Sequence, residues 1–163
     1  MRVEFIPAIV PRELPALVRF DRAVFGERDC FDSAAWREFK AFWMKVEGRK
    51  AGCCALAEHT DFQHDRKGTD VPRKNSLYVA STGIAEGFRG IGLGSLMKAW
   101  QISYARNHGF QRIVTNTRKS NRRMIAVNKK FGFRVIRVTP GYYADPVEAT
   151  VVMELRLGGR DSS

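Results

Sequence analysis

Arg89-Gly90-Ile91-Gly92-Leu93-Gly94-Ser95 is the stretch that decides the fold, because it joins a β-rich run to an amphipathic helix. The run before it, Leu77–Ile84, has the composition of a strand. After the glycines, apolar residues recur at helical spacing from Leu93 to Tyr104, and the pattern stops at His108-Gly109. The sequence therefore predicts a strand, a glycine turn and a helix in this order.

The start of the predicted helix is suited to an anion. Unpaired backbone N–H groups and the helix dipole favour negative charge there, and three alternate glycines let the backbone approach a phosphate closely. Arg89 and Ser95 add a cation and a hydroxyl group. The alternative is that the glycines only form a tight turn and permit close helix packing. We interpret the stretch as a turn that binds a pyrophosphate.

Two nucleotide-binding motifs do not fit this turn. The dinucleotide fingerprint requires its third glycine one residue later than Gly94, and an acidic residue about 20 positions on, where Gln111 and Arg112 stand. A Walker A loop requires a lysine directly before Ser95, and that position is a glycine. The spacing thus excludes both motifs.

Arg89-x-x-Gly92-x-Gly94 instead resembles the R/Q-x-x-G-x-G/A signature of the GCN5-related N-acetyltransferase superfamily, in which this loop cradles the pyrophosphate of acetyl-CoA. Thr82-Gly83-Ile84 resembles the end of the family's fourth strand, and Asn121-x-x-Met124 with residues 128–133 resembles its later helix and strand. The resemblance covers residues 77–157 clearly and residues 1–57 by element order. It implies acetyl-CoA as co-substrate, bound at Thr82, Gly83, Ile84, Arg89, Gly90, Ile91, Gly92, Leu93, Gly94, Ser95 and Asn121.

The hydrophobic pattern of the rest of the chain predicts further strands near residues 3–5, 42–46, 51–57, 111–117, 133–138 and 151–157, and further helices over 12–25, 33–39 and 124–131. With the resemblance, this order implies an α/β fold of the α+β type. We expect a mixed, mostly antiparallel sheet of six to seven strands, flanked by about four helices and splayed between the fourth and fifth strands. Residues 1–157 are expected to form one domain, 158–163 a flexible tail and 58–75 an exposed loop.

A net charge of +11 predicts anionic partners or substrates, but nucleic acid, acidic lipid and a phosphorylated cofactor satisfy it equally. A cluster of four cations, Arg118, Lys119, Arg122 and Arg123, surrounds Asn121. These cations either bind the phosphates of the coenzyme or form a solvated cluster on the surface. Single-stranded nucleic acid would favour interleaved aromatic residues, and none lies between Val114 and Val127. The pattern disfavours nucleic acid.

The chain has no apolar run of signal-peptide or membrane-spanning length. Its three cysteines, Cys30, Cys53 and Cys54, have neither metal-ligand spacing nor an even count for disulfides. We therefore expect a cytoplasmic protein that does not enter membranes. His59 and His64 lie in the polar loop without metal-site spacing, so no metal is assigned.

The proton-transfer residues depart from the family pattern. Several members supply a glutamate on the fifth strand and a tyrosine in the later helix, and this chain has Asn116 and Asn128 at those places. Asparagine can hydrogen-bond an intermediate but cannot act as acid or base. We expect catalytic roles for these two residues and for Tyr143, and contacts with substrate for Tyr142 and Phe31. Both tyrosines are placed between the last two strands, and the loop at Phe31 is weakly similar to that of ribosomal-protein alanine N-terminal acetyltransferases.

The leading hypothesis is an acetyl-CoA-dependent N-acetyltransferase, in which a primary amine, such as a peptide or protein N-terminus, attacks the thioester directly. One alternative is a small-molecule amine acetyltransferase. Others are a non-catalytic acyl-CoA-binding module and a basic nucleic-acid binder. The expected partner is the amine acceptor, and a monomer and a homodimer are both compatible with the sequence.

Overall fold

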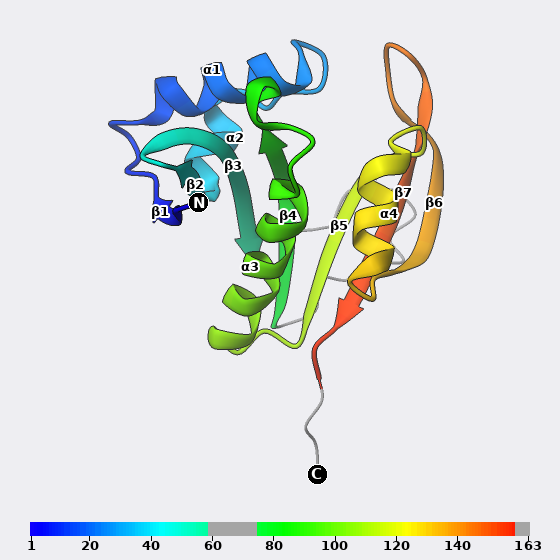
Figure 1. The fold of residues 1–163 in the computed structure, drawn as a ribbon. Coiled ribbons are helices and arrows are strands. Elements are labelled where there is room, and N and C mark those ends of the chain that lie inside the picture. Colours follow the sequence, from blue (N-terminus) through cyan, green and yellow to red (C-terminus); the bar gives the residue numbers. More distant parts are fainter. Residues whose placement is uncertain (59–74, 159–163) are drawn as a thin grey trace. The chain divides into compact units, whose positions relative to one another are not determined.

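The computed structural model describes residues 1–58 and 75–158 (Figure 1). Most of the expected loop 58–75 and of the tail 158–163, with His59 and His64, therefore lies outside the described residues. The elements are β1 (Val3–Pro7), α1 (Leu14–Phe25), α2 (Ser33–Glu38), β2 (Lys40–Val46), β3 (Arg49–Glu58), β4 (Ser76–Ile84), the 3₁₀ helix η2 (Glu86–Phe88), α3 (Leu93–Asn107), β5 (Arg112–Arg118), α4 (Arg122–Lys130), β6 (Arg134–Tyr143) and β7 (Glu148–Arg156).

The strands form a seven-stranded sheet in the order β1-β2-β3-β4-β5-β7-β6. The β4–β5 pair is parallel, whereas the β1–β2, β2–β3, β5–β7 and β7–β6 pairs are antiparallel. A parallel pair requires a crossover, which α3 supplies. The predicted fold class, a mixed and mostly antiparallel sheet with four helices, is confirmed. None of the helices in the described ranges is long and apolar enough to cross a membrane.

Contacts within the chain divide it into two compact units. The first comprises Met1–Leu56 with Ala80–Met97, and the second comprises Ala57–Val79 with Lys98–Ser163. The boundary passes through β4, so Ser76–Val79 pair with β5 in the second unit. The register of this parallel pair runs from Ser76–Arg112 to Val79–Thr115. The splay expected between the fourth and fifth strands begins where this pairing ends, after Val79 and Thr115.

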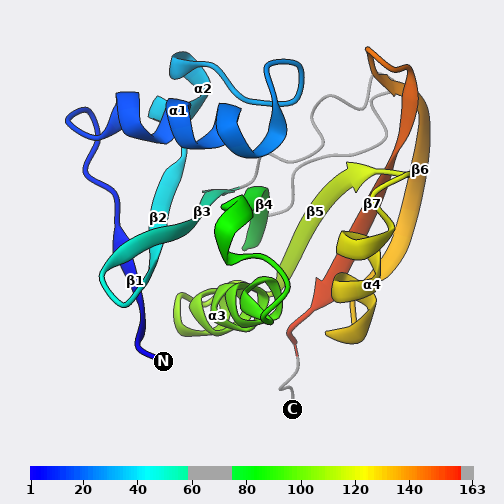
Figure 2. The same cartoon turned by 45° about the horizontal axis from the view of Figure 1, so that its top comes forward.

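The first unit places α1 and α2 over one face of the β2–β3 hairpin (Figure 2). Leu17 from α1 and Trp36 from α2 pack against Trp43 of β2 and Cys53 of β3, and all four side chains are buried. The helix α1 ends at Phe25, and Gly26, which has φ of 82°, caps it by donating its backbone N–H to Arg22 O at 2.8 Å. Asp32 caps α2 by accepting from the Ala35 amide at 2.8 Å.

The strand β2 is buried on both faces. Phe42 and Met44 share one face and Trp43 lies on the other, yet Trp43 is only 2% exposed. Its indole Nε1 donates to Glu13 Oε1 at 3.0 Å, and the ammonium of Lys50 lies 4.2 Å from its ring centroid. Buried and exposed residues do not alternate along β2, because α1 and α2 cover the face that carries Trp43.

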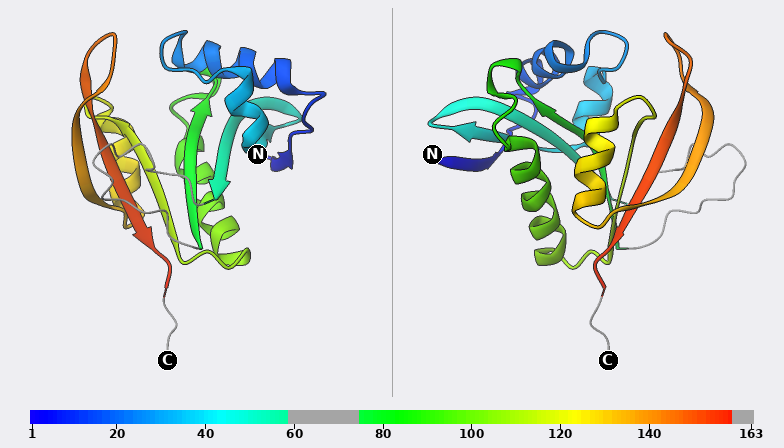
Figure 3. Two further views of the ribbon diagram at one scale, coloured as in Figure 1. Left: turned by 180° about the vertical axis from the view of Figure 1, so that it is seen from behind. Right: turned by 45° about the vertical axis from the view of Figure 1, so that its right-hand side comes forward.

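The second unit is built on the β5–β7–β6 ladder, with α4 across one face (Figure 3). The structure extends β6 to Tyr143, whereas the pattern predicts an end at Val138 and places Tyr142 and Tyr143 between strands. β6 stands at the end of the strand order, so Pro140 can lie in it without removing an internal ladder bond. A register shift between Thr139 and Tyr143 accommodates Pro140-Gly141.

A buried ion pair joins three strands of this unit. Glu154 on β7 is 3% exposed and pairs with Arg112 of β5, whose Nε donates to Ser76 Oγ of β4 at 2.7 Å. Arg156 Nε contacts the other carboxylate oxygen at 3.2 Å. Burial raises the pKa of Glu154, but hydrogen bonds from Arg112 and Arg156 outweigh it, so the pKa lies below its ordinary value. The carboxylate is therefore charged at neutral pH.

Glu154→Gln is expected to lower the free energy of unfolding by about 3 kcal/mol at pH 7, because the side chain of Arg112, only 15% exposed, loses its counter-ion. A lowered folded-state pKa contributes stability above the unfolded-state pKa and loses it as pH falls. The difference between wild type and variant should therefore shrink below about pH 4. Urea unfolding at pH 7 and pH 3.5 measures it.

Glu4→Gln is the matched control, since the Arg2–Glu4 pair at 3.3 Å is exposed. We expect a change below about 0.5 kcal/mol. A constant Glu154→Gln effect at both pH values would contradict the electrostatic origin.

Candidate functional site

The glycine turn leads directly into α3, which begins at Leu93 as predicted. Gly90 and Gly92 have φ of 83° and 87°, in the left-handed region that favours glycine. Leu96 N donates to Gly92 O at 3.1 Å, the first bond of the helix. The amides of Leu93, Gly94 and Ser95 precede it and have no acceptor within the helix. This turn therefore presents successive N–H donors at the positive end of the helix dipole.

Open space lies beside these glycines. A Cβ atom built on Gly90, Gly92 or Gly94 would meet no heavy atom within 4 Å, apart from chain neighbours and the helix backbone. Ile91 is 58% exposed, while Leu93 is buried and anchors the helix. Close helix packing therefore does not explain why position 94 is glycine. A group that approaches the backbone from outside would explain it.

Arg89 has a structural role at the base of the turn. Its Nε donates to Ile84 O at 3.0 Å, which ties the end of β4 to the turn across η2. Gly83 packs against α1, since an added Cβ would lie 3.3 Å from atoms of Phe25 and Val24. Thr82 and Ile84 flank it, both half-buried. The predicted coenzyme-binding residues 82–84 and 89–95 all lie in the first unit.

A second polar cluster in the described residues is centred on Asn116 of β5, in the other unit. The hydroxyl of Tyr78 donates to Asn116 Oδ1 at 2.6 Å, and Asn116 Nδ2 donates to Thr150 Oγ1 at 3.0 Å. The same Nδ2 approaches the hydroxyl of Tyr143 at 3.4 Å. Thr150 is buried and donates to Thr117 O at 3.2 Å. The amide of Asn116 is thus held in one orientation by side chains of three strands.

The strand registers explain this cluster. Tyr78 pairs with Val114 across the parallel β4–β5 ladder, and Val114 and Asn116 share a face because they are two residues apart. Thr150 pairs with Arg118, the next residue of that face. Tyr143 lies at the end of β6, where it pairs with Glu148. Four strands therefore present one row of polar groups.

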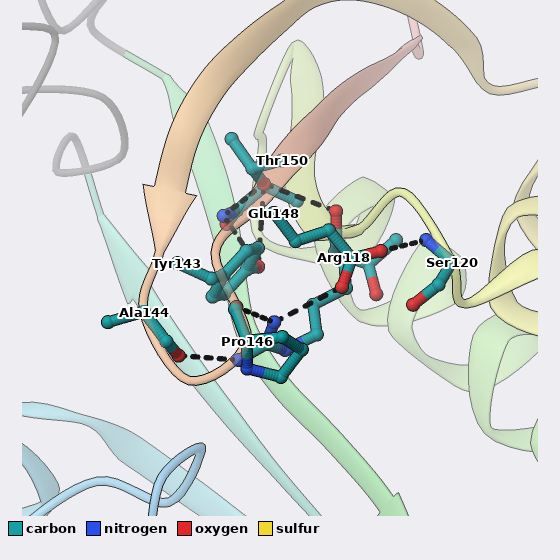
Figure 4. A network of polar contacts seen from close by, with 9 residues as sticks. Arg118, Ser120, Tyr143, Ala144, Pro146, Glu148 and Thr150 are labelled. Atoms are coloured by element: carbon teal, nitrogen blue, oxygen red, sulfur yellow. Dashed lines mark hydrogen bonds and ion pairs between the residues drawn. The ribbon is translucent and has the colours of Figure 1, made fainter.

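Tyr143 is loosely hydrogen-bonded within this row. Its hydroxyl lies 3.4 Å from both Asn116 Nδ2 and Thr150 Oγ1, longer than the usual 2.9–3.0 Å of an N–H···O bond and 2.7–2.8 Å of an O–H···O bond. Its half-buried ring meets the ring of Tyr142 edge-on at 4.9 Å. Arg118 and Glu148 border the cluster, and Figure 4 shows them with Tyr143 and Thr150. Two of the predicted residues, Asn116 and Tyr143, are thus brought together.

Two further predicted residues of the second unit, Asn128 and Asn121, lie in α4 and directly before it. Asn128 on α4 is fully buried, and its Nδ2 contacts Met153 Sδ at 3.6 Å. Among the described residues its Oδ1 has no hydrogen-bond partner. Asn121 caps α4 by accepting from Met124 N at 3.2 Å. The catalytic role of Asn128 and the coenzyme contact of Asn121 stay predictions.

Phe31 lies in the first unit, in the segment before α2. Its amide donates to the buried carboxylate of Asp21 at 2.7 Å, and Trp36 Nε1 donates to the same oxygen at 3.1 Å. Burial raises the pKa of Asp21, and these two hydrogen bonds oppose the shift. The Phe31 ring packs edge-on against Phe39 at 5.1 Å. Asp21 thus holds the segment in place, and the substrate contact of Phe31 stays a prediction.

Sequence reasoning missed Tyr78 and Thr150 as site residues. Tyr78 stands between Leu77 and Val79, which are both buried, so strand alternation directs it to the opposite face. That pattern could have indicated an aromatic side chain with a polar tip on the second face. Thr150 gives no local signal, because its importance depends on the register of β7 against β5.

Comparison with known proteins adds a family and a fold. A sequence model described as the acetyltransferase (GNAT) family matches residues 12–133. A search of curated proteins gives no match. Similar solved structures include the ribosomal-protein-S18-alanine N-acetyltransferase of Escherichia coli, at TM-score 0.79 and 14% identity over 98% of this chain and 97% of that chain.

Two more solved structures have similar folds. A GNAT family acetyltransferase from Elizabethkingia anophelis with acetyl-CoA bound has a TM-score of 0.74 at 16% identity, covering 95% of this chain and 98% of that chain. Ard1 from Thermoplasma volcanium has a TM-score of 0.74 at 17% identity, covering 98% and 100%. At these identities the likeness shows the fold.

Gly92→Ala is expected to lower the free energy of unfolding by about 1 kcal/mol, because an L-residue is strained at φ near 87°. Gly94→Ala is the matched control. It adds the same methyl group to a helical position with open space and should raise stability by up to about 1 kcal/mol. Urea unfolding measures both, and equal effects would contradict the assigned conformations.

Proposed function

Because this chain belongs to the GNAT acetyltransferase family, whose model matches residues 12–133, we propose that it transfers an acetyl group from acetyl-CoA to a primary amine. The family makes the chain an acyltransferase. The observation that carries the proposed donor is the turn Arg89–Ser95, with open space beside its glycines and with helix-start amides that have no acceptor within the helix. These features suit a pyrophosphate, which accepts several backbone hydrogen bonds.

The proposed coenzyme contacts follow from this geometry. The amides of Leu93, Gly94 and Ser95 would bind phosphate oxygens, and Ser95 would add its hydroxyl. Arg89 would supply positive charge while its Nε stays on Ile84 O. Thr82–Ile84, Gly90, Ile91, Gly92 and Asn121 complete the proposed set.

The proposed reaction is direct attack of a neutral amine on the thioester carbonyl. The C–N bond forms and the C–S bond breaks, so the amine loses one proton and the thiolate of CoA gains one. An α-amine with a pKa near 8 is already partly neutral at pH 7, and water can accept its proton. We assign the proton for the thiolate to the hydroxyl of Tyr143, which regains it from solvent. Asn116 would hydrogen-bond this hydroxyl but cannot itself exchange a proton.

The proposed acceptor is a peptide or protein N-terminus. Phe31 and Tyr142 are the proposed acceptor contacts, and the E. coli ribosomal-protein acetyltransferase and Ard1 have similar folds. A net charge of +11 disfavours a polyamine. A small-molecule amine is the alternative acceptor.

An acyl-CoA-binding module without turnover is the second candidate function, because asparagines stand at the two positions where several family members have an acid or base. We place the reaction in the cytoplasm and treat residues 1–157 as one functional domain.

Purified protein with acetyl-CoA and a panel of peptides with free N-termini is expected to yield acetylated peptide and free CoA, read by mass spectrometry. Gly94→Val is expected to abolish this transfer by raising the Kd of CoA at least tenfold, with stability close to that of wild type. Its side chain fills space that no described side chain occupies.

The panel also contains amino sugars and other small amines. Acetylation of these alone would contradict the peptide acceptor and support the alternative. CoA binding without any transfer in single-turnover assays would support the binding module. Wild-type affinity for CoA in Gly94→Val would remove the glycine turn from the donor site.

Tyr143→Phe is expected to lower kcat about 100-fold and to leave the Kd of acetyl-CoA unchanged, because only the proton donor is lost. Tyr104→Phe, which removes a hydroxyl from the α3 tyrosine that stacks on His108, is the control and should keep wild-type kcat. Steady-state kinetics and calorimetry measure the two quantities. An unchanged kcat in Tyr143→Phe would remove this residue from the mechanism.

A further inference from the structure

One arginine holds the tip of the β6–β7 hairpin. Arg118, at the end of β5, donates from Nη2 to Ala144 O at 3.1 Å and from Nη1 to Pro146 O at 2.9 Å (Figure 4). Its Nη1 also contacts Glu148 Oε1 at 3.1 Å. A planar guanidinium can reach two carbonyl groups and a carboxylate together, whereas an ammonium offers a single nitrogen. The tip is thus bound to a neighbouring strand through one side chain.

Glu148 fixes the orientation of this arginine. Its Oε2 accepts from Ser120 N at 2.5 Å, in the connection between β5 and α4. Hydrogen bonding by Ser120, and then by Arg118, lowers the pKa of Glu148. The side chains of Arg118 and Glu148 are 15% and 17% exposed, so the pair is partly shielded from water. The carboxylate offsets the charge of Arg118 within the protein.

Arg118 also contacts the proposed acid. Its guanidinium carbon lies 4.4 Å from the centroid of the Tyr143 ring. Both hydrogen-bond distances from the Tyr143 hydroxyl to Asn116 and Thr150 are 3.4 Å, so these bonds are weak. The cation above the ring and the hairpin tip that it holds therefore contribute to the position of the phenol.

These contacts separate Arg118 from the other cations near Asn121. Lys119, Arg122 and Arg123 are exposed, whereas Arg118 is directed at the hairpin. We propose that Arg118, oriented by Glu148, is a positioning residue that holds the phenol of Tyr143 beside Asn116 and does not bind the coenzyme. This inference rests on the proposed function of Tyr143 as the proton donor.

Arg118→Lys is expected to lower kcat about tenfold, because the tip loses its two-carbonyl contact and Tyr143 leaves its position. The Kd of CoA, measured by calorimetry, should stay within twofold of wild type. Arg134→Lys is the matched control, since Arg134 is exposed at the other end of β6 and should keep both values. A tenfold weaker Kd of CoA in Arg118→Lys with unchanged kcat would overturn the proposal.

A double variant separates positioning from a general loss of structure. If Arg118 acts through Tyr143, Arg118→Lys should lower kcat no further in a Tyr143→Phe background. The same tenfold loss in that background would show that Arg118 acts independently of Tyr143 and would overturn the proposal.

Fluorine NMR of protein labelled with 3-fluorotyrosine tests the contact without any turnover. The Tyr143 resonance, assigned by its absence in Tyr143→Phe, should move and broaden in Arg118→Lys and in Glu148→Gln but not in Arg134→Lys. An unchanged Tyr143 resonance in both Arg118→Lys and Glu148→Gln would overturn the proposal. If the acceptor panel gives no acetylated product, the proposed function fails, and this spectrum still decides the role of Arg118.

Discussion

The division of β4 between two sets of neighbours is the constraint on which the rest of the structure depends. Ser76–Val79 pair in parallel with β5, and the following residues of the same strand belong to the other compact unit. One covalent segment therefore contributes to both candidate sites. Tyr78 reaches Asn116 from its first half, and Ile84 receives Arg89 at its end.

The two candidate sites use different physical means. The glycine turn relies on the backbone, because left-handed glycines and the amides of a helix start present donors without side chains. The Asn116 cluster relies on side chains from four strands whose registers place them in one row. A site made of one backbone segment can be recognised in the sequence as a short motif. A site whose side chains come from several strands cannot.

Tertiary contacts give the four cations around Asn121 different surroundings. In the sequence, Arg118 is one of four cations around Asn121. In the fold, β5 and β7 are neighbours, so Arg118 meets Glu148 and the carbonyl groups of the hairpin tip. Net charge and local spacing therefore describe the attraction to anions but do not assign a role to a single arginine.

The sequence by itself determined the order of the elements and the start of α3 at Leu93, because these depend on neighbours within a few residues. It also predicted the glycine turn before α3, and it singled out Asn116 and Tyr143, which the fold brings together. Only the tertiary structure decided that Trp43 is buried, that β6 runs on to Tyr143 and that Tyr78 and Thr150 hold Asn116. These outcomes depend on strand register and on which face a helix covers, and both arise from contacts between residues far apart in the chain.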